Sequence, residues 1–465
     1  MTFTLGSVGW SIVVLSVVGA IVAGRWNARK SQDQSDQGGL GFILAGRSLT
    51  APLFAVTLIA TWYGSVMASG EFIVRNGVMF LLCFGVPYYI TALCYALFLS
   101  KRIRRSSAIT IPASITETFG KSAGLAASVA VLVISIPAPY MLSLGIVLQV
   151  LTEWPLWVCI VLGTACSLVI VAKGGLRSDV AANVVQLTLM YGGFAALAIG
   201  CVVAFGGVGT MVSALPASTF HIPGTVGWSG VFVWLLISLQ TFVDPNFHMR
   251  SAAARSPREA KLGMLLSVAG WVLFDILQVA VGLYGVAFVS SNDAQWHFLS
   301  VAQAVLPDVL KGLFVASIIA AVMSTLDGYA LVSATTIGHD IMGMLSSKGS
   351  AKRRLYLALL LTGIGGTIAA ITVSSIVDLI MLAASVAVPG LMLPLIASVW
   401  HPLRTVMRKQ RGLPAWILIV LPCVVATVTV IFNKTSGKVV EPMFTGLLAS
   451  IILFPLTRIP NAANK

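Results

Sequence analysis

The chain has 465 residues, of which 58% are hydrophobic and only 9% are charged. A soluble domain carries about 25% charged residues, so this composition excludes a soluble protein and indicates a chain that crosses a membrane many times. The net charge of +14 is explained by basic residues that mark one side of the bilayer, and it does not indicate a nucleic-acid partner. The six cysteines are scattered without a CxxC pair, so they predict neither a disulfide framework nor a zinc site.

The first apolar run, residues 8–24, has no basic residue before it, whereas Arg25, Arg29 and Lys30 follow it. A secretory signal has the opposite polarity, with its basic residues in front of the apolar run. We therefore expect a retained first span whose N-terminus lies outside.

Thirteen apolar stretches approach the length of about 20 residues that a spanning helix needs. They are 8–24, 50–74, 78–99, 123–150, 156–172, 183–207, 229–248, 262–290, 310–345, 354–373, 376–399, 413–432 and 443–457. If the N-terminus lies outside, successive loops alternate between the two sides of the membrane. Of the 29 Lys and Arg residues, all but four then lie on the inner side, the exceptions being Arg75, Lys311, Lys434 and Lys438. The pattern predicts one integral-membrane domain over residues 1–465, with a cytoplasmic C-terminus.

Two of these stretches are interrupted, and they lie five spans apart. The second contains TWYGSVMASG, and the seventh contains QTFVDPNF, in which Pro245 removes a backbone donor. Broken helices at membrane depth expose backbone groups that need protein or ligand partners, and two at corresponding places indicate an inverted-repeat transporter. We therefore expect a first repeat at about 50–207 and a second at about 229–399, flanked by helices 8–24, 413–432 and 443–457. The alternative is that Gly and Pro are simply common in membrane helices.

The ninth span contains SIIAAVMSTLDGYALVSATT, whose polar residues are unsuited to a lipid-facing helix. Ser317, Ala321, Ser324 and Gly328 form a stripe of small residues that another helix can approach closely. The hydroxyls of Ser324 and Thr325 could simply bond back to carbonyls in their own helix. Alternatively, with the Ala321 carbonyl and the broken second span, they could supply the oxygen ligands that a hard cation prefers.

Four segments resemble the sodium/solute symporters, which include the proline, pantothenate, sugar, sialic acid and choline carriers. The segments are GRSLTAPLFAVTLIAT, KGGLRSDVAANVVQ (173–186), DPNFHMRSAAARSPREAKLG (244–263) and AAVMSTLDGYALVSATTIGHDI (320–341). They fall in order and at the expected spans, and the last is the most specific. The resemblance implies an all-α, leucine-transporter-like fold of thirteen helices, with a 5+5 inverted repeat, one extra helix before this core and two after it.

The resemblance also implies a sodium site. Its ligands would be the hydroxyls of Ser324 and Thr325 and the carbonyls of Ala321, Ala60 and Tyr63. Some members bind a second sodium through an Asp in the segment at 173–186, and the matching position here is Asn183. We therefore expect one Na⁺ per transport cycle.

Other polar and aromatic residues are candidates for the substrate cavity. A buried carboxylate is energetically costly in a membrane unless it is paired or liganded. Four aspartates in or near apolar spans are therefore functional candidates: Asp244, Asp275, Asp327 and Asp378. Asp244, at the break of the seventh span, could bind a substrate cation or cap the inner half-helix, and capping is slightly favoured. Candidate substrate residues are Trp62, Gln240, Phe242 and Asp244. Trp62 could stack on a quaternary ammonium group or form one apolar wall of the cavity.

We expect a sodium-coupled symporter of the bacterial plasma membrane that imports a small organic solute by alternating access. An amino acid, an organic acid or a quaternary amine would fit, whereas the polar residues of the sugar carriers are not reproduced. One rival is a proton-coupled transporter of the same fold, with Asp244 or Asp327 as the carrier. A sensor or channel is less favoured. No HExxH, GxSxG or P-loop motif indicates an enzyme or a nucleotide-driven pump.

Overall fold

A computed structural model describes residues 3–29, 40–289, 294–345, 350–372, 376–407, 412–437 and 440–459. These residues form helices joined by turns, with two isolated β-bridges, Leu49 with Ala254 and Leu413 with Thr457. The α-helices are α1 (Ser7–Arg29), α2 (Leu40–Leu44), α3 (Ala51–Ala60), α4 (Val66–Asn76), α5 (Val86–Cys94), α6 (Ser100–Arg105), α7 (Ile111–Phe119), α8 (Lys121–Ser135), α9 (Ala138–Thr152), α10 (Leu156–Gly174), α11 (Leu176–Phe205), α12 (Val208–Ala214), α13 (Gly227–Ser238), α14 (Pro245–Ala253), α15 (Pro257–Phe288), α16 (His297–Val305), α17 (Asp308–Thr335), α18 (Met342–Leu345), α19 (Ala351–Thr372), α20 (Ile376–Val399), α21 (Ile417–Ser436) and α22 (Pro442–Leu453).

Eleven helical stretches within the described ranges are long and apolar enough to cross a bilayer. The second and thirteenth predicted spans correspond to shorter apolar helices, Ala51–Ala60 and Pro442–Leu456. An all-helical polytopic membrane protein is therefore confirmed, whereas the count of thirteen spans stays a prediction.

The predicted breaks are present. α3 ends at Ala60 and α4 begins at Val66, so five residues of irregular backbone divide the second predicted span. The seventh predicted span divides into α13, the short 3₁₀-helix η5 (Leu239–Phe242) and α14. A third break was not predicted. The stretch 123–150 was expected as one helix, but α8 ends at Ser135 and α9 begins at Ala138, because Pro137 has no backbone N–H to continue the ladder.

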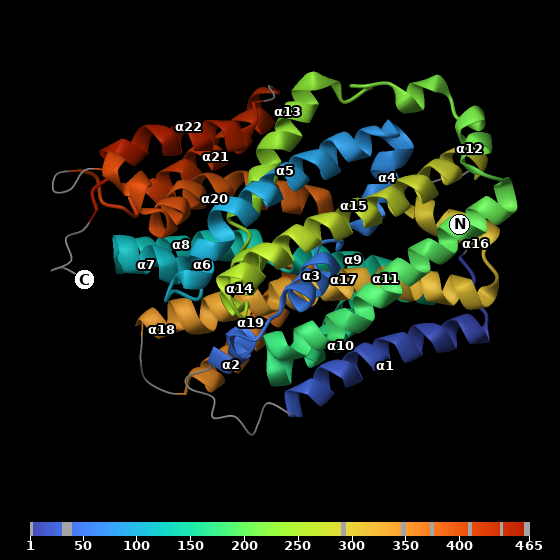
Figure 1. The fold of residues 1–465 in the computed structure, drawn as a ribbon, viewed down its shortest axis with the longest axis horizontal. Helices are drawn as coiled ribbons and strands as arrows, with labels where there is room; N and C mark the ends of the chain where they lie inside the picture. Colours follow the sequence, from blue (N-terminus) through green and yellow to red (C-terminus); the bar gives the residue numbers. More distant parts are fainter. Residues whose placement is uncertain are drawn as a thin grey trace.

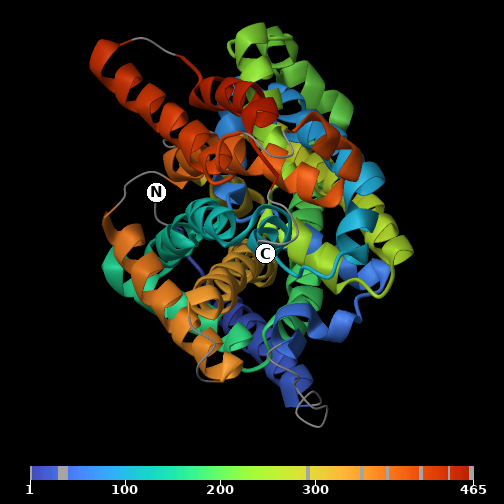
Figure 2. The same ribbon diagram turned by 90° about the vertical axis from the view of Figure 1, so that its left-hand side faces the viewer.

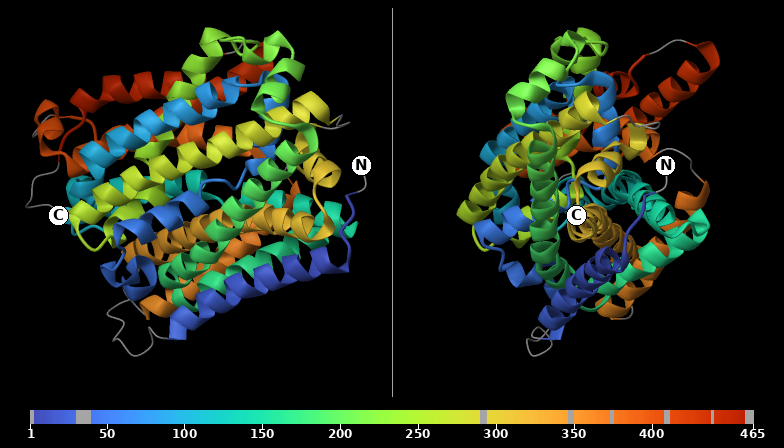
Figure 3. Two further views of the ribbon diagram at one scale, coloured as in Figure 1. Left: turned by 45° about the vertical axis from the view of Figure 1, so that its right-hand side comes forward. Right: turned by 90° about the vertical axis from the view of Figure 1, so that its right-hand side faces the viewer.

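α17 is the central helix of the bundle. Every residue from Phe314 to Thr336 is buried, and α17 packs against α11, α1 and α19. In end-on views the gold ribbon of α17 lies inside the ring formed by the other helices (Figures 2 and 3). A polar stripe on this helix therefore faces protein rather than lipid.

The peripheral elements show the two ends of the bundle. α6, which carries Lys101, Arg102, Arg104 and Arg105, lies toward the left end in Figure 1, and α12 and α16 lie toward the right end. α21 and α22 pack side by side and against α20 at the edge of the molecule. Several basic residues used to assign the sides lie outside the described residues: Lys30, Lys348, Arg408, Lys409, Arg411, Lys438 and Lys465.

Candidate functional site

The turn between α3 and α4 packs directly against α17. A Cβ atom added at Gly64 would lie 2.7 Å from Cβ and Cγ2 of Thr325 and 2.5 Å from Cδ1 of Tyr140. Only glycine leaves room for this approach. The hydroxyl of Ser143 donates to the Gly64 carbonyl over 3.2 Å, which fixes the turn from a third helix. The structure thus brings the break that contains Tyr63 next to Thr325.

The hydroxyls of Ser324 and Thr325 are both buried and both donate to protein acceptors. Ser324 Oγ donates to Oδ1 of Asn183 over 2.6 Å, and Thr325 Oγ1 donates to the carbonyl of Ala321 over 3.0 Å. Thr325 thus bonds back within its own helix, whereas Ser324 bonds to α11. Because each hydroxyl hydrogen is used in this way, the oxygen lone pairs stay available to a cation.

The backbone carbonyls of Ala60 and Tyr63, at the break in the second span, differ in their hydrogen bonding. The Tyr63 carbonyl accepts from the N–H of Val66 over 3.1 Å. In the described part of the chain, no backbone N–H donates to the carbonyl of Ala60. The end of α3 therefore presents an acceptor at membrane depth, which requires a partner from protein, water or an ion.

A buried ion pair lies beside this region. Nη2 of Arg250 and Oδ2 of Asp179 are 3.0 Å apart, and both side chains are completely buried. Arg250 also donates to Oγ1 of Thr57 over 3.2 Å and to Oδ1 of Asn246 over 2.8 Å. The sequence predicts a seventh span that ends at residue 248, which leaves Arg250 in the inner loop after it, and this prediction is wrong. Arg250 belongs to α14, and the carboxylate of Asp179 on α11 replaces its water shell.

Hydrogen bonds connect this ion pair to Ser324. Nδ2 of Asn183 donates to Oγ1 of Thr57 over 2.6 Å, while Oδ1 of the same amide accepts from Ser324. Thr57 in turn accepts from Arg250. A continuous buried polar network therefore joins α17, α11, α3 and α14, which include parts of both interrupted spans. Sequence reasoning missed this network.

Asp244 caps the inner half of the seventh span. Its Oδ1 accepts from the backbone N–H groups of Asn246 over 2.8 Å and Phe247 over 3.4 Å. This confirms the capping alternative. Its Oδ2 accepts from the hydroxyl of Tyr329 over 2.8 Å. The ring of Tyr329 stacks on Tyr140 with centroids 5.0 Å apart, so α14, α17 and α9 meet at this carboxylate.

A cavity of about 110 Å³ opens beside the break in the second span. Trp62 and Gln240, two of the four candidate substrate residues, line it, whereas Phe242 and Asp244 are not among its lining residues. The full lining is Thr61, Trp62, Tyr63, Ser65, Ala68, Ser69, Phe80, Phe84, Tyr88, Tyr140, Trp234, Ile237, Gln240, Asp275, Tyr329, Ile380 and Met381. We refer to this space as the central cavity. Eight of these 17 lining residues are aromatic.

Trp62 belongs to an aromatic cluster at the edge of the central cavity. Its ring lies 5.2 Å from Tyr88 in an edge-on arrangement, 4.9 Å from Trp271 and 5.6 Å from Phe247, measured between centroids. Packing on several sides holds the indole in one orientation, so Trp62 forms a rigid wall.

Asp275 on α15 lines the same cavity and is 3% exposed. Its Oδ1 accepts from the hydroxyl of Tyr63 over 2.9 Å and from Nε2 of Gln278 over 3.1 Å. Its Oδ2 accepts a close hydrogen bond from the hydroxyl of Tyr89. Sequence reasoning flagged Asp275 as a costly carboxylate but did not place it at the cavity.

Asp327 is fully buried on α17 and accepts a close hydrogen bond from Ser167 on α10 through Oδ1. Among the described residues, its Oδ2 makes no hydrogen bond of ordinary geometry, although the side chain of Gln186 interacts with the carboxyl group. The side chain of Asp378 lies outside the described residues.

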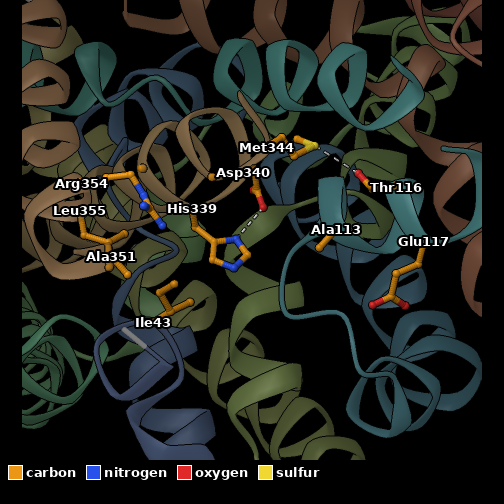
Figure 4. A pocket seen from close by; sticks show the side chains of 12 residues that line it. Ile43, Ala113, Thr116, Glu117, His339, Asp340, Met344, Ala351, Arg354 and Leu355 are labelled. Carbon is orange, nitrogen blue, oxygen red and sulfur yellow. Dashed lines mark hydrogen bonds and ion pairs between the residues drawn. The ribbon is translucent and has the colours of Figure 1, made fainter. Parts of the chain in front are cut away.

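A second cavity, of about 420 Å³, lies at the far end of α17 (Figure 4). His339 and Asp340 come from the π-helical turn η7 (Thr336–Ile341), Glu117 comes from α7, and Arg354 comes from α19. Nδ1 of His339 lies 2.9 Å from Oδ1 of Asp340. None of the predicted sodium or substrate residues lines this cavity.

The fold resembles those of solved transporters. A Na⁺-coupled sialic acid symporter, solved in a substrate-bound outward-open state, has a TM-score of 0.80 at 15% identity, covering 97% of each chain. Mhp1, a nucleobase-cation-symport-1 family transporter, has a TM-score of 0.62 at 13% identity, covering 89% of this chain and 93% of Mhp1. MhsT, crystallised with L-phenylalanine, has a TM-score of 0.54 at 15% identity. The fold is shared, in agreement with the leucine-transporter-like fold that the resemblance implied.

Curated relatives are distant. High-affinity choline transporter 1 of Drosophila melanogaster is 22% identical over 388 residues, 79% of this chain and 62% of the relative. The uncharacterized symporter YidK of Escherichia coli is 26% identical, with 74% and 65% covered. The high-affinity proline transporter PutP of Bacillus subtilis is 24% identical, with 68% and 70% covered. This chain thus spans less than two thirds of the length of the first two.

The model of the sodium:solute symporter family matches residues 42–408, most of the chain and all of the elements that form the break, the network and the central cavity. The protein belongs to the sodium:solute symporter family.

Proposed function

We propose that the protein is a sodium-coupled symporter that imports a small organic solute by alternating access. The family and the fold of its neighbours support this proposal. The energy source is the Na⁺ gradient, and the partners are Na⁺, the solute and the lipid bilayer.

The observation that carries the proposal is the close contact between the broken second span and the paired hydroxyls of α17. Because Gly64 has no side chain, Thr325 can pack directly against the break. The hydroxyl of Ser324 donates to Asn183, and that of Thr325 donates to the Ala321 carbonyl. Carbonyl oxygens at the end of α3 and hydroxyl oxygens on α17 suit a hard cation. We assign one Na⁺ per cycle to Ala60, Tyr63, Ala321, Ser324 and Thr325. Thr325 would turn its hydrogen away from the Ala321 carbonyl when the ion binds.

The proposed topology has thirteen spans with the N-terminus outside and the C-terminus in the bacterial cytoplasm. The first repeat runs over about 50–207 and the second over about 229–399, with the helices at 8–24, 413–432 and 443–457 outside the repeats. The breaks at α3–α4 and at η5 are corresponding positions in this arrangement.

The central cavity is the proposed substrate site. It adjoins both breaks, because Trp62 belongs to the first and Gln240 to the second. Binding of Na⁺ would hold the α3–α4 turn against α17, and the same turn supplies Trp62 to the cavity. Occupancy of the ion site and the shape of the substrate site are thereby coupled. In this proposal Phe242 is part of the η5 turn at the second break, and Asp244 caps the N-terminus of α14.

Proton coupling is the second candidate, and one observation favours it. Asp327 is fully buried and, among the described residues, forms no ion pair. A carboxyl group in such a setting can exchange a proton during transport. Under this candidate, neutralising Asp327 would abolish uptake, and Na⁺ would have no effect.

A thermal-shift series on purified protein tests the proposal. A ligand that binds the folded state raises the unfolding temperature with concentration. We expect Na⁺ to raise it relative to K⁺ at equal ionic strength. The Ser324→Ala/Thr325→Ala double variant should lose this response.

Thr335→Ala is the matched control, because Thr335 is buried on the same helix and also bonds back to a carbonyl four residues earlier. It should keep the Na⁺ response. Equal curves in Na⁺ and K⁺ for the unmodified protein, with shifts that follow pH instead, would replace sodium coupling by proton coupling.

A further inference from the structure

The central cavity contains one acidic group and, among its described lining residues, no Lys, Arg or His. The acidic group is Asp275. The buried guanidinium of Arg250 does not compensate it, because Arg250 is paired with Asp179 and has no exposed surface. When Asp275 is ionised, no positive group in the described lining balances its charge.

Burial opposes ionisation of Asp275, whereas the uncharged groups around it favour the carboxylate. Tyr63, Tyr89 and Gln278 all donate to the carboxylate, and all three are uncharged. Hydrogen bonds to the charged form favour ionisation. A buried negative charge that lacks a positive partner is expensive at membrane depth. A cation in the cavity would remove that cost.

The walls of the cavity suit an organic cation. Trp62, Tyr88, Trp234 and the stacked pair Tyr140–Tyr329 line it. Trp62 and Tyr88 meet at an interplanar angle of 71°, so their rings form two sides of a corner rather than a flat stack. Aromatic faces attract ammonium groups, most strongly where water is excluded.

The described lining of the cavity offers no positive charge to an anion. The first turn of α4 faces it, and a helix N-terminus can bind anions through free N–H groups. Here the N–H groups of Val66, Ala68 and Ser69 already donate to the carbonyls of Tyr63 and Ser65. A carboxylate in the solute would find only uncharged donors such as Ser65, Ser69 and Gln240 in the described lining, and no cationic partner.

We propose that the transported solute is an organic cation, an ammonium or quaternary ammonium compound, with Asp275 as its counter-charge and the aromatic walls as its cage. This inference rests on the proposed function, in that the central cavity is the substrate site. It extends that proposal by choosing one solute class among the three that the sequence left open.

The test uses the unmodified full-length protein in detergent, with Na⁺ present and K⁺ as the control cation. The probes are tetramethylammonium, choline, the neutral carbon isostere of choline (dimethylbutanol), glycine betaine and pantothenate. We expect tetramethylammonium or choline to raise the unfolding temperature further in Na⁺, and the neutral isostere and pantothenate to have no effect. An equal response to choline and its isostere, or a response only to pantothenate or betaine, would overturn the inference.

Asp275→Asn keeps the size of the side chain and removes its charge. It should weaken the apparent affinity for the organic cation about tenfold or more, the loss expected for a charge-assisted contact, and keep the Na⁺ response. Glu71→Gln is the control, since Glu71 forms an exposed pair with Arg75 outside the cavity lining. It should behave like the unmodified protein. If Asp275→Asn does not fold, the comparison of choline with its isostere on the unmodified protein still decides.

The two proposals fail in different ways. A protein that responds to Na⁺ but to neither organic cation retains sodium coupling and refutes the cationic substrate. A protein that responds to choline equally in Na⁺ and K⁺ retains the cationic substrate and refutes sodium coupling.

Discussion

Oγ of Ser324 donates a 2.6 Å hydrogen bond to Oδ1 of Asn183, and through this amide the hydroxyl is connected to Thr57 and Arg250. The bond fixes the hydroxyl hydrogen on the Asn183 side. The Ser324 oxygen therefore keeps its lone pairs for an ion. Asn183 is, in this account, the residue that orients a sodium ligand.

Asn183→Ala should accordingly weaken sodium binding without removing any proposed ligand. Loss of one oriented hydrogen bond costs about 1 kcal/mol, so the Na⁺ concentration at half-maximal stabilisation should rise about five- to tenfold. Sodium titrations of the unfolding temperature measure this change. Thr188→Ala is the control on the same helix, because the exposed Thr188 bonds only within α11. An unchanged sodium midpoint in Asn183→Ala would show that the amide does not orient Ser324.

Gly64→Ala should disrupt the break in the second span. The new methyl group would overlap Thr325 and Tyr140, and such overpacking costs about 1–3 kcal/mol. We expect a lower unfolding temperature and a reduced response to Na⁺, since the turn would move away from α17. Gly192→Ala, where a Cβ meets nothing within 4 Å, should change neither quantity. A normal Na⁺ response in Gly64→Ala would contradict the close approach as a requirement of the site.

Arg250→Met should be strongly destabilising, because it leaves Asp179 buried without a counter-charge. Breaking a buried pair costs about 3–5 kcal/mol. The Asp179→Leu/Arg250→Met double variant should recover much of this loss, since no unpaired charge remains. Unfolding temperatures and the fraction of monodisperse protein on size-exclusion chromatography measure both. A double variant less stable than either single variant would show that the two residues act independently.

The Asp327→Asn variant distinguishes sodium coupling from proton coupling. In the sodium account, Asp327 is not a ligand, so the variant should keep the Na⁺-dependent stabilisation. Ser167, which donates to Asp327, provides a second variant, Ser167→Ala, that leaves the carboxyl group in place. Loss of all Na⁺ response in Asp327→Asn, together with its retention in Ser167→Ala, would make Asp327 part of the ion site.

Features that depend on local chain chemistry could be predicted from the sequence. Apolar length predicted the eleven long apolar helical stretches, and the sequence TWYGSVMASG and Pro245 predicted the breaks after α3 and before α14. The α8–α9 break was missed although Pro137 and Pro139 signal it, because the apolar run continues through them.

The polar network could not be predicted in the same way. Ser324 and Asn183 are 141 positions apart, and Arg250 and Asp179 are 71 positions apart. Such pairs arise only when separate helices pack, and helical periodicity does not report which helices meet. The sequence places Arg250 just beyond the seventh span because a lone charged side chain favours water, whereas pairing with Asp179 on α11 makes its burial possible.

Equilibrium binding of radioactive sodium to the purified protein tests the central claim most directly. The sodium site between the α3–α4 turn and α17 predicts saturable binding of one ion per chain, loss of this binding in Thr325→Ala, partial recovery in Thr325→Ser and full binding in Thr335→Ala. Equal sodium binding by the unmodified protein and Thr325→Ala, or no saturable binding by the unmodified protein, would contradict it.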